Sequence, residues 1–398
     1  MKRVKLAMLV DRVVPALTAN FNAAAKLMEF VAIETGARSD FKLPLNCERI
    51  SFGSSKTLRW FKPEFSKMMR TIRPDVIVTL GWWGVEHLAG LYWGTTNKVP
   101  VIVASDSAHY NFPRTRLREA IKRKILSLFS VGWAAGSAAA EYLIELGMER
   151  DRVLVGPVDS IDVGHFKSGA ARTRTRAAEV RAQLNLPLEY FLSVSRLASE
   201  KNIPTILKAY KLYKDEFPKD AWKLVIVGSG PLESNIRQVI QDWGLERDVC
   251  LPGQVDFEAL PAYYALGGAL IHASMKDTWA VVVNEAMAAG LPVIVSAQSG
   301  SAKELVAEGC NGFIFDARDP VALAKRLAEI AYGRPDRRLM GNAGQQRIAN
   351  WAPESYAASL LEATTLARTM PVPRVSMVDK TLLTALIMSR KAAALQPI

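Results

Sequence analysis

Two carboxylates lie eight residues apart in an otherwise small and apolar stretch, SMKDTWAVVVNEAMAAGLPVIV, which spans residues 274–295. They are Asp277 and Glu285. A charged group that is buried without a partner costs several kcal/mol of folding free energy. Each acid in such a segment therefore needs a partner or a site that it faces.

Two cations follow another apolar run, FLSVS. They are Arg196 and Lys201, five residues apart in SRLASEKN. An arginine fork and a lysine point charge just past a strand suit a diphosphate. A third run, KLVIV, ends in GSGP, where Gly228 and Gly230 let the backbone approach a ligand closely. These positions predict a site for a ligand that carries a phosphate group.

Other phosphate and nucleophile motifs are absent. The GxG at Gly228 continues to Glu233 where a dinucleotide fingerprint needs a third glycine, so it is equally typical of a tight strand–helix turn. The sequence has no GxxxxGK[ST] loop and no GxSxG elbow. Its four histidines and three cysteines show no metal-ligand spacing, which argues against a zinc site.

Short apolar runs alternate with amphipathic segments along the whole chain. In the first half the strand-like runs are 4–10, 75–80 and 100–106; in the second they are YFLSVSRL, WKLVIVG, VCLPG, ALIHAS, LPVIVS and GFIF. This pattern predicts α/β architecture with a doubly wound parallel sheet in each half. The polar run KSGAARTRTR, residues 167–176, is interpreted as an irregular approach to a domain boundary.

Length and charge narrow the class of protein. With 398 residues, two domains are expected. Residues 1–185 carry 28 Lys and Arg against 17 Asp and Glu, a net +11, whereas residues 186–398 carry 23 against 22, a net +1. A basic first half suggests an anionic partner. No apolar run is long enough for a signal peptide core or a membrane span, and the scattered cysteines fit reduced thiols in the cytoplasm.

The second half resembles the nucleotide-sugar-binding domain of the retaining GT-B glycosyltransferases of family 4. Five segments match that family in order between residues 190 and 331. They are SVSRLASEKN, VGSGPLES, LPGQVDFEALPAYYALGGALIHAS, DTWAVVVNEAMAAGLPVIVS and SGSAKELVAEGCNGFIFD. Weaker similarity covers SDSAHYNFPRTRLREAIKRKIL and LGMERDRVLVGPVDSIDVGHF. The family's glycine-rich turn after the first strand is not evident, since VDRVVPALTANFN stands in its place.

The resemblance implies a role for each matched residue. Arg196 and Lys201 would hold the donor diphosphate and stabilise the charge on the leaving group. Glu285 would accept hydrogen bonds from the ribose, and Asp277, which stands where the family usually has Glu, would face the donor sugar. Both carboxylates would then face a ligand rich in hydroxyl groups, and neither would be truly buried. Contacts to sugar and phosphate would come from the turn at Gly228 and Gly230 and from the backbone of Thr278, Trp279, Ala280, Val281 and Val282. No metal and no cofactor is expected.

Three features of the first half are open to two interpretations. His109, in SDSAHY, is a candidate for contacting the donor sugar or a packed loop residue. Trp82 and Trp83, in LGWWG, are an acceptor platform or core residues. The segment 114–124, RTRLREAIKRK, carries six cations. It fits either a helix that binds an anionic lipid surface or a helix face exposed to solvent. No nucleic acid is expected as a partner.

Together these points predict a retaining GT-B glycosyltransferase. Residues 1–185 would bind the acceptor and residues 186–350 the nucleotide-diphosphate sugar. These two Rossmann-like domains would face a central cleft, and residues 351–398 would cross back toward the first. The acceptor would be a polysaccharide or lipid-linked precursor, and the protein cytoplasmic or peripheral on the membrane. The alternatives are a non-catalytic sugar- or nucleic-acid-binding protein and another GT-B enzyme such as a nucleotide-sugar epimerase.

Overall fold

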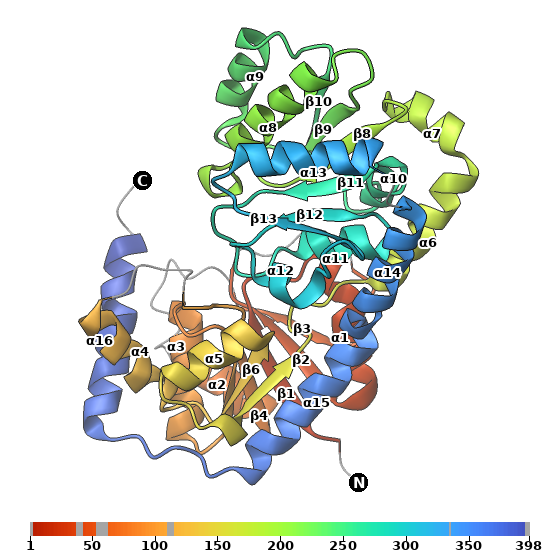
Figure 1. The fold of residues 1–398 in the computed structure, drawn as a ribbon. Helices are drawn as coiled ribbons and strands as arrows, with labels where there is room; N and C mark the ends of the chain where they lie inside the picture. Colours follow the sequence, from red (N-terminus) through yellow and green to blue (C-terminus); the bar gives the residue numbers. More distant parts are fainter. Residues whose placement is uncertain (1–2, 37–42, 53–62, 110–114, 334–335, 395–398) are drawn as a thin grey trace. The chain divides into compact units, whose positions relative to one another are not determined.

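The computed structural model describes residues 3–36, 43–52, 63–109, 115–333 and 336–394, and they form two compact units. Unit 1 consists of residues 1–160 and 353–398, and unit 2 of residues 161–352. Each unit is a parallel sheet with helices on both faces, so the predicted α/β class is confirmed (Figure 1).

Unit 1 contains a sheet of seven strands in the described part of the chain, in the order β3-β2-β1-β4-β5-β6-β7. Its strands are β1 Lys5–Val10, β2 Glu29–Glu34, β3 Glu48–Ser51, β4 Val76–Leu80, β5 Val101–Ser105, β6 Val131–Ala135 and β7 Val153–Gly156. Its helices are α1 Pro15–Leu27, α2 Pro63–Ile72, α3 Val85–Thr96, α4 Arg116–Leu126, α5 Ser137–Glu145, the 3₁₀ turn Arg150–Arg152, α15 Pro353–Thr369 and α16 Met377–Ala394.

Alternate residues of the unit 1 strands enter two separate cores. In β1, Leu6 and Met8 pack toward α1 and α15, whereas Ala7 and Leu9 pack toward α2, α3 and α16. Because successive side chains of a strand point to opposite faces, a strand covered on both sides must be apolar throughout. This explains why KLAMLV is a continuous apolar run after its lysine.

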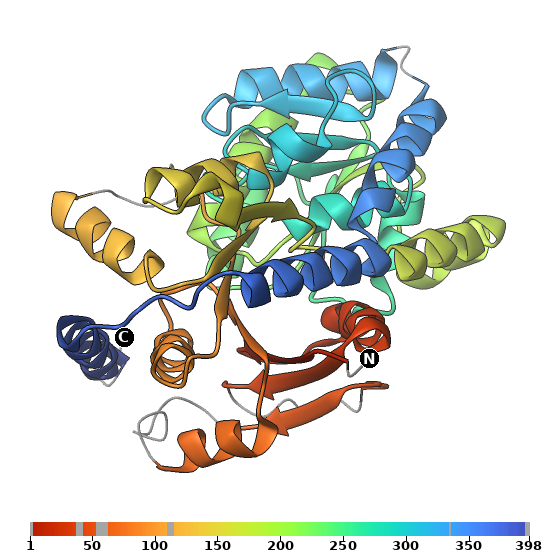
Figure 2. The same cartoon turned by 90° about the horizontal axis from the view of Figure 1, so that it is seen from below.

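The end of the chain belongs to unit 1. Helix α15 lies beside α1 and contributes Tyr356, Leu360 and Ala363 to the core on that face (Figure 2). Helix α16 packs on α3 and buries Leu383 and Ile387. Unit 1 is therefore built from two stretches of sequence that are far apart.

Unit 2 contains a six-stranded parallel sheet, β10-β9-β8-β11-β12-β13, among the described residues. The strands are β8 Tyr190–Val194, β9 Lys223–Val227, β10 Val249–Gly253, β11 Ala269–His272, β12 Val293–Ser296 and β13 Gly312–Phe315. The helices are α6 Val163–Thr175, α7 Ala177–Leu184, the 3₁₀ turn Ser199–Lys201, α8 Ile203–Glu216, α9 Glu233–Asp242, α10 Leu260–Leu266, α11 Val281–Ala288, α12 Gly300–Leu305, α13 Pro320–Tyr332, α14 Arg337–Ile348 and the 3₁₀ turn Ala349–Trp351.

The interpretation of residues 167–176 as irregular is wrong, because most of them belong to α6. The helix is anchored by Phe166, Gly169 and Ala170, which are buried. A β-carbon on Gly169 would come within 2.7 Å of the Pro261 side chain on α10, so the small residues allow two helices to approach closely. The arginines occupy the exposed side, and polar composition concealed the helical period.

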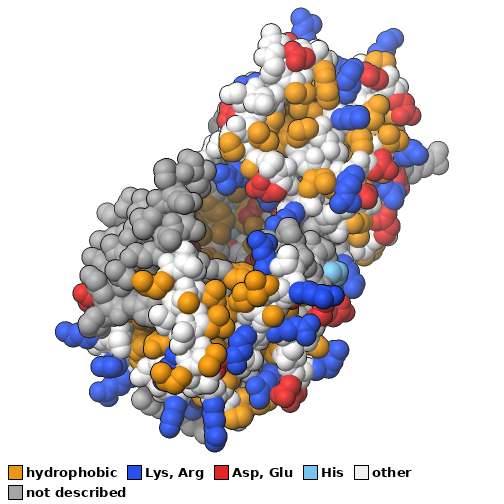
Figure 3. Space-filling view, turned by 90° about the vertical axis from the view of Figure 1, so that its left-hand side faces the viewer, with side chains coloured by type: hydrophobic (Ala, Val, Ile, Leu, Met, Phe, Trp, Pro, Cys, Tyr) orange, Lys and Arg blue, Asp and Glu red, His pale blue; other side chains and the backbone are white. Residues whose placement is uncertain are grey.

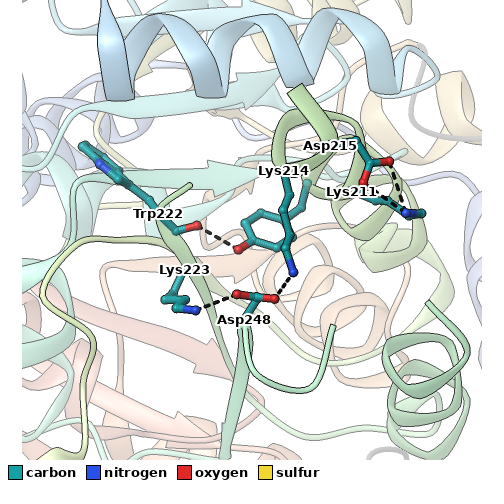
Figure 4. Close-up of polar contacts among 7 residues, drawn as sticks. Lys211, Lys214, Asp215, Trp222, Lys223 and Asp248 are labelled. Carbon is teal, nitrogen blue, oxygen red and sulfur yellow. Dashed lines mark hydrogen bonds and ion pairs between the residues drawn. The ribbon is translucent and has the colours of Figure 1, made fainter. Parts of the chain in front are cut away.

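Ionic contacts close the edge of the unit 2 sheet at which strands begin. Asp248, just before β10, lies between Lys214 and Lys223, with 2.6 Å from Lys223 Nζ to Asp248 Oδ1 (Figure 4). Burial would raise the pKa of Asp248, but the two ammonium groups lower it below its ordinary value. The Tyr210 hydroxyl donates to the Trp222 carbonyl oxygen at 2.8 Å. The polar groups at this edge thus form hydrogen bonds and ion pairs with one another.

The surface of unit 1 carries both charged and apolar side chains. Lys and Arg side chains are spread over the visible face of unit 1, with apolar side chains between them (Figure 3). No described helix is both long enough and apolar enough to cross a bilayer. Cys47, Cys250 and Cys310 are free thiols.

Candidate functional site

The order of strands in unit 2 reverses between β8 and β11, and the predicted site residues lie at this point. The chain proceeds from β8 outward to β9 and β10, then returns to β11 on the other side of β8 and proceeds to β12 and β13. Arg196 and Lys201 follow β8, and Asp277 follows β11. Loops separate at such a switch point, and ligands of open α/β sheets bind there.

Lys201 and Asp277 form the centre of the site. Lys201 Nζ lies 2.5 Å from Asp277 Oδ2, and the two side chains are 22% and 12% exposed. The same carboxylate oxygen is 3.1 Å from Nε2 of His272, the last residue of β11, and 3.4 Å from the Ser274 hydroxyl. The structure thus brings together two residues that are 76 positions apart in the sequence.

The partners of Asp277 keep it ionised. Burial alone would raise the pKa of this carboxyl, but the hydrogen bond from His272 and the charges of His272 and Lys201 hold its pKa well below the usual range. An ionised carboxylate accepts hydrogen bonds and donates none. Asp277 can therefore receive sugar hydroxyls, as the resemblance implies, while it also orients the Lys201 ammonium.

Gly228 and Gly230 pack their turn directly on the loop that carries Arg196. Gly228 has φ +135, and a β-carbon there would lie 1.9 Å from the Ser195 carbonyl oxygen. At Gly230 a β-carbon would lie 2.5 Å from the Leu197 carbonyl oxygen. Both glycines are required by this close approach, whatever ligand contacts they make. Arg196 itself is exposed, and its guanidinium has no ion-pair partner in the part of the chain that the structure describes.

Asn202 ties three loops of the site together, and sequence reasoning missed it. Its backbone is left-handed, with φ 57. Its Nδ2 donates to the Ala273 carbonyl oxygen at 3.1 Å and to the Ala317 carbonyl oxygen at 2.8 Å. These bonds join the loops after β8, β11 and β13. The signal available in the sequence was an asparagine, a residue that tolerates left-handed backbone, directly before the start of a helix.

The segment from Thr278 to Val282 presents backbone groups. Its five N–H groups have no hydrogen-bond acceptor among the described residues. Ala280 has φ 79 and ψ 71, a strained conformation for alanine, and it turns the chain into α11. The Trp279 side chain is 2% exposed and its Nε1 donates to Asn284 Oδ1 at 3.1 Å, so Trp279 can offer only its backbone to a ligand.

Glu285 is buried, which corrects the expectation that neither carboxylate would be. It lies in α11, is 7% exposed, and accepts a hydrogen bond of 2.6 Å from the Tyr264 hydroxyl on α10. Burial raises the pKa of Glu285 to about 7, although the bond from Tyr264 opposes this change. The tyrosine offsets part of the desolvation cost. No contact joins Glu285 to Arg196 or Lys201 in the described structure.

Two buried hydroxyls in the same region were also missed. Ser195 Oγ and Ser301 Oγ are buried and have no hydrogen-bond partner among the described residues. Ser195 directly follows β8, and Ser301 lies at the start of α12, beside the loop of Asp277. A serine directly after a predicted strand was the available signal for the first of them.

The remaining candidates lie in unit 1. His109 is exposed in the loop after β5. Trp82 is a core residue with 3% exposure, Trp83 is partly buried against the same core, and both also line a pocket of unit 1. Arg196, Lys201, Asp277, Glu285 and the backbone segment 278–282 belong to unit 2.

The basic segment forms α4, but two of its cations are used within the protein. Lys122 is buried and donates to Glu119 Oε1 at 2.8 Å and to the Tyr142 hydroxyl at 2.6 Å. Lys124 pairs with Asp379 of α16 at 2.8 Å. Arg116, Arg118 and Arg123 are exposed, and residue 114 lies outside the described part of the chain. Binding of an anionic lipid surface stays a prediction that rests on these three arginines.

In the described residues no group of three His, Cys, Asp or Glu side chains is arranged to hold a metal ion. The cations that follow β8 at the β8/β11 edge are Arg196 and Lys201.

Comparison with known proteins finds similarity to glycosyltransferases. Residues 177–347 match the family model described as glycosyl transferases group 1. The amylovoran biosynthesis glycosyltransferase AmsK of Erwinia amylovora is 30% identical over 170 residues, 40% of this chain and 39% of that protein. The D-inositol 3-phosphate glycosyltransferase of Corynebacterium urealyticum is 26% identical over 237 residues, 57% and 55% of the two chains. The chain thus spans about half the length of such relatives.

Solved structures match over nearly the whole chain. Anabaena HepE in complex with UDP and glucose aligns with TM-score 0.73 and 20% identity over 91% of this chain and 99% of that one. The sucrose-phosphate synthase of Thermosynechococcus elongatus aligns with TM-score 0.70 and 20% identity over 90% and 98%. These likenesses establish the GT-B fold, two Rossmann-like domains in one chain.

Proposed function

We propose that this protein is a glycosyltransferase that moves a sugar from a nucleotide-diphosphate donor to a hydroxyl acceptor with retention of configuration. The observation that carries the proposal is the arrangement at the β8/β11 switch point. There Arg196 and Lys201 are cations that can bind a phosphate group, and Asp277 is a carboxylate that can accept hydrogen bonds from hydroxyl groups. The match of residues 177–347 to glycosyl transferases group 1 supports it.

In the transfer, the acceptor oxygen bonds to the anomeric carbon while the bond from that carbon to the diphosphate oxygen breaks. The electron pair of the broken bond remains on the diphosphate, and the acceptor hydroxyl proton leaves with the nucleoside diphosphate. Negative charge develops on the departing oxygen, and fixed cations aimed at such charge stabilise a transition state most effectively. Arg196 and Lys201 take this role, with the N–H groups of residues 278–282 around sugar and phosphate.

The two acids have different roles in this proposal. Asp277 accepts hydroxyls of the donor sugar and orients Lys201 through the 2.5 Å contact. Glu285 accepts the ribose hydroxyls and releases the Tyr264 hydroxyl in part when it does so. Since the pKa of Glu285 is about 7, a ligand hydroxyl that donates to it also favours its ionised form.

The names of similar proteins support a choice of donor and acceptor class to test. HepE is named in complex with UDP and glucose, so a uridine diphosphate sugar is the first donor to test. AmsK is named for amylovoran biosynthesis, which supports a saccharide precursor as acceptor. We propose that the reaction needs no divalent cation, because the cations of the site are side chains.

Substitution of Arg196 by Ala tests the proposal. Loss of one preorganised charge donor lowers turnover by roughly 10²–10³-fold. Purified protein is first screened with UDP-, GDP- and ADP-sugars for a thermal shift, since a ligand that binds only the folded state raises its stability. Transfer is then measured with the donor found, in the presence and absence of EDTA.

Arg237→Ala is the matched control. Arg237 is exposed on α9, and its partner Glu233 lies one helical turn away. This variant should transfer at the wild-type rate. A rate for Arg196→Ala equal to that of the control would contradict the transferase and favour a non-catalytic binding protein. No thermal shift with any nucleotide sugar would count against both the donor class and the reaction.

A further inference from the structure

A pocket of about 430 Å³ opens in unit 1 at the carboxyl ends of β1, β4 and β5. The order of the unit 1 sheet reverses between β1 and β4, so the pocket lies at that unit's own switch point. Its volume falls in the range of small-molecule sites, about 300–1,000 Å³. Its apolar wall comes from Met8, Leu17, Phe21 and Tyr356.

Two buried donors or acceptors in this pocket lack partners. Trp82 is 3% exposed, and its Nε1 is buried with no hydrogen-bond partner among the described residues. The same holds for Nδ1 of His87, which follows on α3. Buried polar atoms without partners are rare in folded proteins, and each requires a physical reason. Here both belong to residues that line one cavity, so a polar ligand in that cavity is the simplest reason.

The charge of the pocket is opposite to that of its surroundings. Glu86, Asp106 and Asp159 line it, and no Lys or Arg does so among the described residues. Residues 1–185 nevertheless carry a net charge of +11. Burial lowers the pKa of His87 to about 4, against the opposing charge of Asp11, so this imidazole is neutral at physiological pH. A phosphate group would meet only like charge here, whereas sugar hydroxyls would find acceptors.

We propose that this pocket binds the acceptor as an uncharged sugar unit, and that its carboxylates exclude a phosphorylated sugar. The indoles of Trp82 and Trp83 supply aromatic surface for the C–H faces of the ring. The Trp82 N–H and the His87 imidazole bond to hydroxyl oxygens, and Asp106 accepts hydroxyl protons. The inference rests on the proposed function and adds the substrate class that the acceptor site selects.

Calorimetric titration of the full chain tests this proposal. The probes are the methyl α-glycosides of glucose, mannose and galactose, and the 6-phosphates of the same three sugars. At least one neutral glycoside should bind, and each 6-phosphate should bind at least about 10-fold more weakly than its neutral counterpart. Equal or tighter binding of the phosphates, or no binding of any glycoside at tens of millimolar concentration, overturns the proposal.

Two variants locate the binding in this pocket. Trp82→Phe keeps the aromatic surface and removes the N–H, which should weaken the neutral glycoside about 5- to 10-fold, the scale of one hydrogen bond. Asp106→Asn should narrow the gap between neutral and phosphorylated sugars. Trp243→Phe, at an exposed tryptophan of unit 2, is the matched control and should change neither affinity.

Thermal melting shows whether each variant is folded, and Asp106→Asn provides the test if Trp82→Phe does not fold. Equal affinities of Trp82→Phe and Trp243→Phe for the neutral glycoside would show that the glycoside does not bind in this pocket. The proposed function fails separately. If glycosides bind as expected but no nucleotide sugar shifts the melting temperature, the donor assignment is lost and the sugar pocket remains.

Discussion

The loop after β11 and helix α11, which follows it, each carry one carboxylate, and the two groups are held in opposite ways. Asp277, in the loop, is bound by a lysine and a histidine, and its pKa lies well below the ordinary value. Glu285, in the helix, is bound by one neutral tyrosine, and its pKa is raised to about 7. The fold therefore stabilises the ionised form of Asp277 and disfavours the ionised form of Glu285, although the two acids are only eight residues apart.

This difference shows that burial by itself does not determine the state of an acid. Desolvation raises the pKa of both groups. The partners differ, since Lys201 is a cation and Tyr264 is not, and opposite charge lowers the pKa of an acid. The same isosteric substitution, acid to amide, should consequently have opposite effects on stability at the two positions.

Asp277→Asn should have the largest effect on stability. The amide removes the anion and leaves Lys201 and His272 facing a neutral group, so the free energy of unfolding should fall by roughly 3 kcal/mol at neutral pH. Urea titration with circular dichroism measures it. Because the pKa of Asp277 is lowered by folding, its contribution is complete above about pH 4 and is lost as the pH falls further, and the gap to the wild type should close in that range.

Asp215→Asn is the control for this substitution. Asp215 pairs with Lys211 on the surface of α8, where both side chains are largely exposed (Figure 4). A surface pair of this kind contributes about 0.3–0.5 kcal/mol. If Asp277→Asn destabilises the protein no more than Asp215→Asn does, the contact to Lys201 is not the stabilising interaction described above.

Glu285→Gln should act in the opposite direction at alkaline pH. In the unfolded chain this acid titrates near its ordinary value of 4.5, and in the folded chain near 7. Between these values the folded state keeps a proton that the unfolded state has released, so stability falls as the pH rises, by about 1.4 kcal/mol per pH unit. The amide cannot titrate, and the variant should exceed the wild type by up to roughly 3 kcal/mol at pH 8.

Nucleotide-sugar transfer should decline in Glu285→Gln even as stability rises, because an amide is a weaker acceptor for ribose hydroxyls than a carboxylate. Denaturation curves at pH 5 and pH 8 separate the two effects, with Glu233→Gln on the surface of α9 as the control. Equal stability of the variant and the wild type at both pH values would show that Glu285 titrates normally in the fold.

Tyr264→Phe should have the smallest effect of the three. The ring is retained and one hydrogen bond to a buried acid is lost, which costs about 1–2 kcal/mol. The pKa of Glu285 should rise further, since the Tyr264 bond is the contribution that lowers it. Titration of the Glu285 carboxyl by NMR measures the change. An unaltered pKa would show that the 2.6 Å contact does not persist in solution.

Sequence reasoning was effective where local patterns decide the structure. The apolar runs predicted β4, β5 and the strands of unit 2. Gly228 and Gly230 were interpreted as a close approach to a ligand, and the structure shows in addition that they pack on the loop after β8. It failed where a distant residue decides. The residues near Glu285 give no sign that the Tyr264 hydroxyl, 21 residues earlier in the sequence, donates a hydrogen bond to it. The polar run ending at Arg176 concealed a helix because only its small residues face the neighbouring helix.

The pocket of unit 1 was within partial reach of the sequence. Trp82 and Trp83 were recognised at the end of a strand, and the sequence left open whether they were core residues or a platform for the acceptor. The two interpretations do not exclude each other, since Trp82 belongs to the core and also lines the pocket. Asp106 follows β5 directly and could have been noted by the same rule. Asp159, after β7, joins them only because the sheet brings β7 to the same edge as β1 and β4.

The return of the chain to unit 1 has a consequence for synthesis on the ribosome. Unit 2 is continuous in sequence and can complete its core once residue 352 has emerged, whereas unit 1 lacks α15 until residue 369 has emerged. Until then the apolar surface that Tyr356, Leu360 and Ala363 later cover is exposed on the nascent chain. Unit 1 is thus begun before unit 2 during synthesis but can be completed only after it, and its unfinished core is exposed to aggregation in the interval.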